Sequence, residues 1–294
     1  MVENTVGFDR SVHNLGNILL LEHVNLAVTD QLLAISFYVE ILGFTRDPYL
    51  SVGLNNIWIN AGRQQFHLPT SSHKAQVLRG EIGLIFPSLH QLRSRLSSAS
   101  KQLKSTEFSW SENEESINVI CPWGNRFICR EADINSSGMK IGIPYINLKV
   151  PTGAANGISR FYKQIFGTPS HLISGARGLE SAVVKIGLEQ SIVFTEEKGS
   201  SIDAYDGHHI AIYVSNFSAP HFALKSSGFI TEESNEWQYR FESIYDPDDG
   251  TVLYNLEHEV RSATHPMFAR NLINRNPNSN LQNFLRGSEN MDIG

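Results

Sequence analysis

Histidine and glutamate side chains lie in several segments whose pattern is typical of β-strands. His23 stands in an alternating segment, His67 lies in QQFHLP, and Glu131 and Glu257 end the segments FICRE and VLYNLE. Imidazole and carboxylate groups bind divalent metals and transfer protons. Every second side chain of a strand points to the same face, so residues from separate strands can converge on one point. A single histidine in a strand is more often a partly buried structural residue, so the surrounding elements must decide.

The segments around these residues occur twice. LEHVNLAV (from Leu21) and IPYINLKV (from Ile143) both alternate, and each leads into a helical segment with a Phe-Tyr pair and a closing glycine, Gly43 or Gly167. GEIGLIF matches HHIAIYV, and the turns PWGN and DPDDG precede the two strands that end in glutamate. The offsets are 122 (23 to 145), 128 (81 to 209) and 126 (131 to 257). A nearly constant offset predicts a duplicated half.

Each half divides again into two units of one strand, one helix and further strands. Period-2 alternation places His23 and Asn25 on one face of the first strand and Val24 on the other. The expected domains are 1–140, which includes an N-terminal arm, and 141–262, followed by a flexible tail over 263–294 with room for a short docking helix near 280–285. The four predicted βαβββ units span about 21–70, 79–132, 143–197 and 207–258.

These motifs, in this order, resemble the vicinal oxygen chelate superfamily, which includes glyoxalases, bleomycin-resistance proteins and extradiol dioxygenases. The resemblance covers roughly residues 21–258. It implies an α+β fold of four βαβββ units paired into two tandem vicinal-oxygen-chelate domains. In that family, two units form a curled trough around one metal ion, with ligands from the first and last strands of each unit.

Carried over by this resemblance, the first half offers His23, His67, Glu81 and Glu131 as metal ligands. Two imidazoles and two carboxylates suit Fe(II), Mn, Co, Ni or Zn. The apolar face of the strand from Gly80 should meet the helices, which leaves Glu81 facing the trough. The resemblance makes Glu131 the expected catalytic base.

The corresponding positions of the second half are Tyr145, Val193, His209 and Glu257. Extradiol dioxygenases of the family hold iron in the second half with two histidines and a glutamate, and Tyr145 departs from that pattern. We therefore expect a second, weaker pocket with Tyr145, His209 and Glu257. A register slip of one residue would bring His208 into the trough in place of His209.

Three functions remain open at this point. The first is a glyoxalase-like metal-dependent isomerase or lyase that acts on a small metabolite with neighbouring oxygens. The second is an extradiol-type ring-cleaving dioxygenase, which needs three open positions on iron. The third is a metal-free small-molecule-binding protein, like the bleomycin-binding relatives.

Composition sets broad limits on the partners. Apolar residues make up 41% of the chain and charged residues 18%, which suits packed cores. The net charge of -6 gives no basic face for nucleic acid. Cys121 and Cys129 form no disulfide framework, and no apolar stretch is long enough to span a bilayer. We expect a cytoplasmic protein with a small-molecule substrate and without nucleic-acid or membrane partners, and a homodimer stays open.

Overall fold

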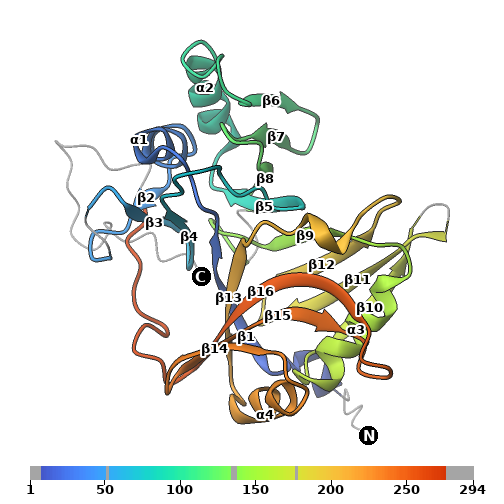
Figure 1. Cartoon of the computed structure of the whole chain (residues 1–294). Coiled ribbons are helices and arrows are strands. Elements are labelled where there is room, and N and C mark those ends of the chain that lie inside the picture. Colours follow the sequence, from blue (N-terminus) through green and yellow to red (C-terminus); the bar gives the residue numbers. More distant parts are fainter. Residues whose placement is uncertain (1–7, 51–52, 134–137, 176–177, 276–294) are drawn as a thin grey trace, which may run out of the picture.

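The computed structural model describes residues 8–50, 53–133, 138–175 and 178–275. Four successive units of one strand, one helix and three strands follow one another along the chain (Figure 1), as the repeat predicts. The first unit consists of β1 (Ile18–Asn25), α1 (Gln31–Ile35) with its π-helical continuation η2 (Ser36–Ile41), β2 (Thr45–Arg46), β3 (Asn56–Ala61) and β4 (Gln64–Pro69). The second consists of β5 (Gly80–Phe86), α2 (Leu89–Ala99), β6 (Ser109–Glu112), β7 (Ile117–Ile120) and β8 (Arg126–Glu131).

The third and fourth units repeat this order. The third consists of β9 (Tyr145–Val150), α3 (Ala154–Gln164), β10 (Ser170–Ser174), β11 (Glu180–Ile186) and β12 (Gln190–Glu196). The fourth consists of β13 (His209–Val214), α4 (Ser218–Ser226), β14 (Ile230–Asn235), β15 (Gln238–Tyr245) and β16 (Val252–Ser262). Two short 3-10 turns, η1 (Arg10–His13) and η4 (Ile202–Ala204), lie outside the repeat.

Local sequence signals explain where the helices begin and end. The Asp30 carboxylate accepts hydrogen bonds from two backbone N–H groups in the first turn of α1, and the Ser88 hydroxyl caps α2 in the same way. Gly43 and Gly167, which follow the first and third helices, have φ angles of +83° and +60°. The left-handed ends predicted from these two glycines are therefore confirmed.

The strands form two mixed eight-stranded sheets, which confirms the α+β class and the assembly of four units into two pairs, although each unit pairs with a unit of the other half. The first sheet has the order β14-β15-β16-β13-β1-β4-β3-β2, so it joins the first and fourth units. The second has the order β10-β11-β12-β9-β5-β8-β7-β6, which joins the second and third units. Each sheet thus contains strands from both halves of the chain. The domain boundaries at 140/141 and 262/263 stay a prediction.

Alternation in the first sheet separates a packed face from a polar face. Val24, Phe66 and Ile210 are fully buried in the hydrophobic core that the helices cover. Their neighbours His23 and His209 point to the other side, which is the concave face of the sheet; we call it the first trough. The predicted parity of β1 is therefore confirmed.

β1 departs from regular pairing at two places. Its register with β13 shifts between Ile18 and Leu20 and again between Leu21 and His23. A bulge gives one strand an extra residue that need not follow the alternation. At the second shift the extra residue is Glu22, whose carboxylate lies on the same side of the sheet as His23, within 2.7 Å of its Nδ1.

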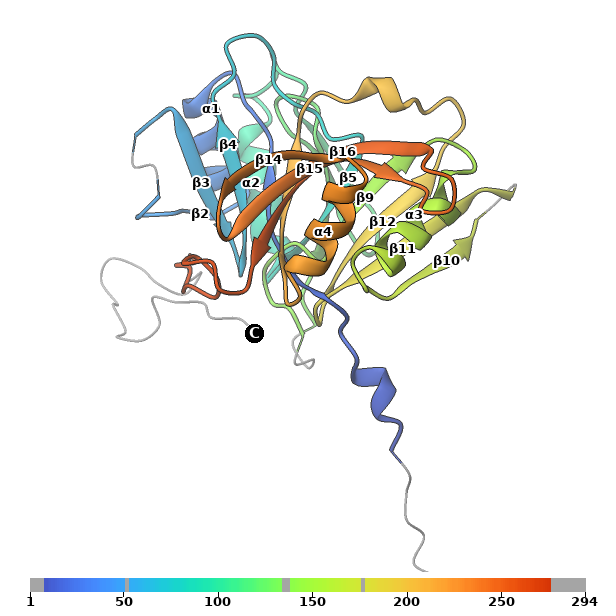
Figure 2. The same ribbon diagram turned by 60° about the horizontal axis from the view of Figure 1, so that its bottom comes forward.

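The C-terminal segment (residues 263–275) is the part of the expected flexible tail that the structure describes. It crosses from the end of β16 to the β3–β4 hairpin. The backbone of Gly62 exchanges two 2.8 Å hydrogen bonds with the Asn274 side chain, and Arg270 donates to Asp47 at 2.6 Å. The expected docking helix lies outside the described residues. The N-terminal arm with η1 extends away from both sheets (Figure 2).

Two smaller expectations concern the cysteines and the membrane. Cys121 and Cys129 are both free thiols buried in the core, as predicted. Among the described residues, the helices are too short or too polar to cross a bilayer.

Candidate metal centre

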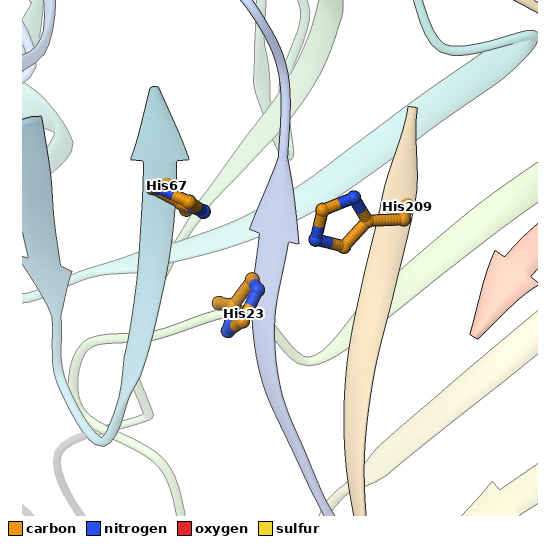
Figure 3. Close-up of side chains that lie close together, drawn as sticks. All are labelled: His23, His67 and His209. Atoms are coloured by element: carbon orange, nitrogen blue, oxygen red, sulfur yellow. The ribbon is translucent and has the colours of Figure 1, made fainter. Parts of the chain in front are cut away.

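Three histidines from neighbouring strands meet in the first trough. His67 on β4, His23 on β1 and His209 on β13 turn toward one another (Figure 3). Each offers one ring nitrogen, and these nitrogens lie within 4.8 Å of one another. The ring centroid of His23 lies 5.6 Å from that of His67 and 5.6 Å from that of His209, and the His67 and His209 centroids are 6.4 Å apart. The indole of Trp58 stacks on His67 at a centroid distance of 3.9 Å. The stacked indole fixes one ring of the group.

Hydrogen bonds fix which nitrogen of two imidazoles is available. The Nδ1–H of His23 donates to Glu22 at 2.7 Å, which leaves Nε2 as the lone-pair nitrogen. The Nε2–H of His67 donates to Asn56 at 2.5 Å, which leaves Nδ1. The Nε2 atoms of His23 and His209 are buried and have no hydrogen-bond partner among the described residues. Buried orphaned nitrogens require an explanation, and a shared metal ion supplies one.

The electrostatics keep the imidazoles of His67 and His209 uncharged, which is the state that binds metals. Burial, aided by nearby positive charges, lowers the pKa of His67 to about 3. Burial likewise moves the pKa of His209 far below its ordinary value. Burial raises the pKa of Glu22, but His23 and Arg261 outweigh it and hold that pKa below its ordinary value. Glu22 is thus an anion that accepts a hydrogen bond from the Nδ1–H of His23.

Two carboxylates on β16 border the cluster. The Oε1 atom of Glu257 lies 3.4 Å from Nδ1 of His209, and Oε2 of Glu259 lies 3.7 Å from its Nε2. Arg240 pairs with both carboxylates, at 2.6 Å for Glu257, and Arg261 pairs with Glu259. Burial raises the pKa of Glu257 although Arg240 opposes the effect.

The predicted four-ligand set does not converge, and this prediction is wrong. His23 and His67 lie in the first sheet, whereas Glu81 and Glu131 lie in the second. Glu131 is exposed and accepts a 2.8 Å hydrogen bond from the backbone N–H of Leu89, at the start of α2. It stabilises that helix end and does not lie with the histidines that it was expected to join.

The weaker second pocket is divided in the same way. His209 and Glu257 lie in the first trough with the histidines of the first unit. Tyr145 lies in the second sheet, where its ring covers Gly83: a Cβ there would come within 2.3 Å of it. Burial and the nearby Glu81 charge raise the pKa of Tyr145. In the described residues, the second sheet gathers no comparable group of histidines and carboxylates.

The register question is settled in favour of His209. His208 faces the opposite side of β13, where its Nδ1 pairs with Asp206 at 2.6 Å and the ring is fully buried. Val193 is apolar, as expected for the position that corresponds to His67.

Sequence reasoning missed Glu22 and Glu259. Glu259 stands two residues beyond the ladder partner of His209, as His67 stands two residues beyond the ladder partner of His23. Glu259, the second glutamate of the segment EHEV, is therefore the counterpart of His67 in the fourth unit. The polar residues of this segment were the signal in the sequence that could have identified it. Glu22 gave no signal, because strict alternation assigns it to the core face.

Solved structures identify this arrangement of units. Glyoxalase I from Zea mays superposes with a TM-score of 0.61 at 14% identity, over 83% of this chain and 92% of that one. A candidate dioxygenase from Bacillus subtilis subsp. subtilis str. 168 gives 0.55 at 11% identity, over 84% and 86%. The chain has the vicinal oxygen chelate fold. The cppA protein from Streptococcus pneumoniae TIGR4 shares that fold, with 0.51 at 14% identity over 84% and 99%. No family model and no curated protein matches the sequence.

This vicinal oxygen chelate fold places the histidine cluster where strands of two paired units meet. The three histidines come from the central strands β4, β1 and β13, which are adjacent in the first sheet. The cluster could hold a divalent metal through three ring nitrogens. The resemblance found in the sequence is confirmed at the level of the fold.

Proposed function

We propose that the protein is a metal-dependent, glyoxalase-like enzyme, an isomerase or lyase that acts on a small metabolite with two neighbouring oxygens. One observation carries this proposal: beside His67, the buried Nε2 atoms of His23 and His209 have no hydrogen-bond partner in the described part of the chain. A catalytic zinc usually has three protein ligands, as three histidines would supply, and one position open for water or substrate. The same nitrogens suit Co, Ni, Mn or Fe(II). The likeness to glyoxalase I of Zea mays supports the reaction class.

A bound divalent ion would supply Lewis acidity that polarises a carbonyl or hydroxyl oxygen of the substrate. The three imidazoles add no negative charge, so the ion's charge remains available to the substrate oxygens. Glu257 replaces Glu131 as the candidate base. Its raised pKa and its position beside His209 suit a carboxylate that accepts a proton from a substrate carbon.

Ring cleavage by a dioxygenase is the second candidate, and Glu259 favours it. Its carboxylate is engaged by both Arg240 and Arg261. A carboxylate paired with arginine is a poor fourth metal ligand. With three protein ligands, the ion would have more coordination positions open to substrate and O₂.

Reconstitution separates the two reactions. Metal-depleted protein is loaded with Zn, Co, Ni, Mn or Fe(II), and assayed with 2-oxoaldehyde–thiol adducts and with catechols, with and without air. The proposal expects turnover of the adducts without O₂ and its loss in Glu257→Gln, with metal retained. Turnover of catechols only, with Fe(II) and O₂ uptake, supports the dioxygenase.

A protein that binds none of these metals contradicts both enzymatic proposals. It would favour the metal-free binding protein of the same fold, in which the trough serves as a pocket. Metal titration by calorimetry at pH 7 gives this answer before any substrate is known.

A further inference from the structure

A cavity of 450 Å³ lies between the first trough and the C-terminal segment. Leu19, Leu20 and Tyr213 line it from the sheet, and Met267, Phe268 and Leu272 line it from the segment. The ring of Phe268 contacts that of Tyr213 at a centroid distance of 4.9 Å. None of the three clustered histidines lines it. The cavity is therefore separate from the metal centre, and a segment outside the four units closes it.

The charged side chains of the cavity wall, Glu22, Arg63 and Arg270, are each paired with other protein groups. Glu22 binds His23 and Arg261, both at 2.7 Å. Gln65 donates to Asn60 at 2.6 Å, and Arg270 pairs with Asp47. Arg63, which also lines the cavity, has an interaction of its own. A charged ligand would have to break these pairs and would leave a buried charge without its partner.

Apart from Asn271 and from Asn274, whose side chain is bonded to Gly62, the remaining wall is aliphatic, aromatic or glycine. The volume falls within the range of small-molecule pockets. A molecule there gains by burying apolar surface against leucine, methionine and aromatic side chains. We infer that the C-terminal segment closes a second binding site, which takes a small, uncharged, largely apolar molecule of one or two rings. This inference does not depend on the proposed reaction, because the wall contains no metal ligand.

The site lies next to the metal centre. Glu22 lies in the cavity wall and also accepts the hydrogen bond of His23. An occupant of the cavity would therefore contact the carboxylate that orients a candidate metal ligand. The molecule is therefore an accessory ligand rather than the substrate held at the ion.

Indole is a suitable probe, because it is uncharged, apolar and of the required size. Its binding to the full-length protein is measured by calorimetry and by the rise in melting temperature, which mass action requires for any ligand of the native state. We expect saturable binding at one site. Met267→Trp and Leu272→Trp fill the cavity from the segment side, and each should lower the affinity at least tenfold.

Leu172→Trp is the matched control, because Leu172 is partly exposed on β10 of the second sheet. It should leave the affinity unchanged, and circular dichroism should show that all three variants fold. Absence of indole binding to the wild type overturns the inference. So does wild-type affinity for indole in both Met267→Trp and Leu272→Trp. Tighter binding of benzoate than of indole also overturns it. Loss of indole binding after metal removal would place the ligand at the histidine cluster and overturn it as well.

Discussion

At the scale of single residues, the site depends on which ring nitrogen each histidine presents. Glu22 sets the tautomer of His23, and Asn56 sets that of His67. Carboxylates and amides that hold a ligating imidazole in this way raise its basicity and fix its orientation. The bulge in β1 that carries Glu22 is therefore part of the metal centre.

Glu22→Gln tests this role. The amide still fills the space and can accept from His23, but it loses the charge that favours the Nδ1–H tautomer. Metal affinity should fall about 10- to 100-fold. Competition with a chromophoric chelator measures it, and Glu257→Gln, which leaves the His23 bond intact, is the comparison. Equal affinity in Glu22→Gln and wild type would remove Glu22 from the centre.

At the scale of elements, adjacent residues of β1 have opposite roles. His23→Gln should abolish tight metal binding and change the stability of metal-free protein little, because the amide fills most of the buried space and can still donate to Glu22. Val24→Ala deletes methyl groups from a fully buried position and should cost about 1–3 kcal/mol with metal still bound. Urea unfolding in EDTA and metal analysis together test both. A strongly destabilised metal-free His23→Gln would make His23 a structural residue.

His258 on β16 bonds to Tyr162 on α3, and its lowered pKa should make the free energy of unfolding depend on pH. Its Nε2 accepts from the Tyr162 hydroxyl at 2.7 Å, and burial lowers its pKa to about 4. The unfolded chain binds this proton near pH 6.5, so the free energy of unfolding should fall as the pH drops from 6.5 to 4. The loss should approach about 3 kcal/mol.

His258→Gln removes this titration and should flatten the pH dependence in that range. His67, whose folded pKa is also low, contributes in the same direction, so some slope remains. Urea unfolding of metal-free protein at pH 4.5 and pH 7 measures the difference. An unchanged slope in the variant would assign the acid sensitivity to other groups.

At the scale of the whole molecule, the repeat predicts the units but not their partners. Alternation and turn residues are local, so they located the four units, the parity of His23 and the cap glycines. The local sequence pattern of the first unit is compatible with pairing to the second unit and equally with pairing to the fourth. In the structure it pairs with the fourth, which brings His209 to His23 and takes Glu81 and Glu131 away.

The register of the last strand is equally non-local. Glu131 was matched to Glu257 because both end a strand, but Glu131 pairs with Phe86 on β5, whereas Glu257 pairs with His209 at the start of β13. Ladder register depends on the partner strand, which the sequence of one strand does not contain. The contacts of the C-terminal segment with Gly62 and Asp47 were not predicted for a related reason, since they join residues more than 200 positions apart.

Separated halves test the partner assignment. Residues 1–140 carry His23 and His67 but not His209, so this half should bind metal at least 100-fold more weakly than the whole chain. Co-expression with residues 141–294 should restore one site if the two halves associate. Tight, stoichiometric metal binding by residues 1–140 alone would show that the first half has a complete site of its own.

The most direct measurement is the metal content of the purified protein and its single variants after loading with Zn or Co and gel filtration. We predict one ion per chain in wild type, and less than a tenth of that in His23→Ala, His67→Ala and His209→Ala. Glu81→Ala and Glu131→Ala, the matched carboxylate variants of the second sheet, should retain the full ion. Full retention in any of the three histidine variants, or loss in either glutamate variant, would contradict the three-histidine centre.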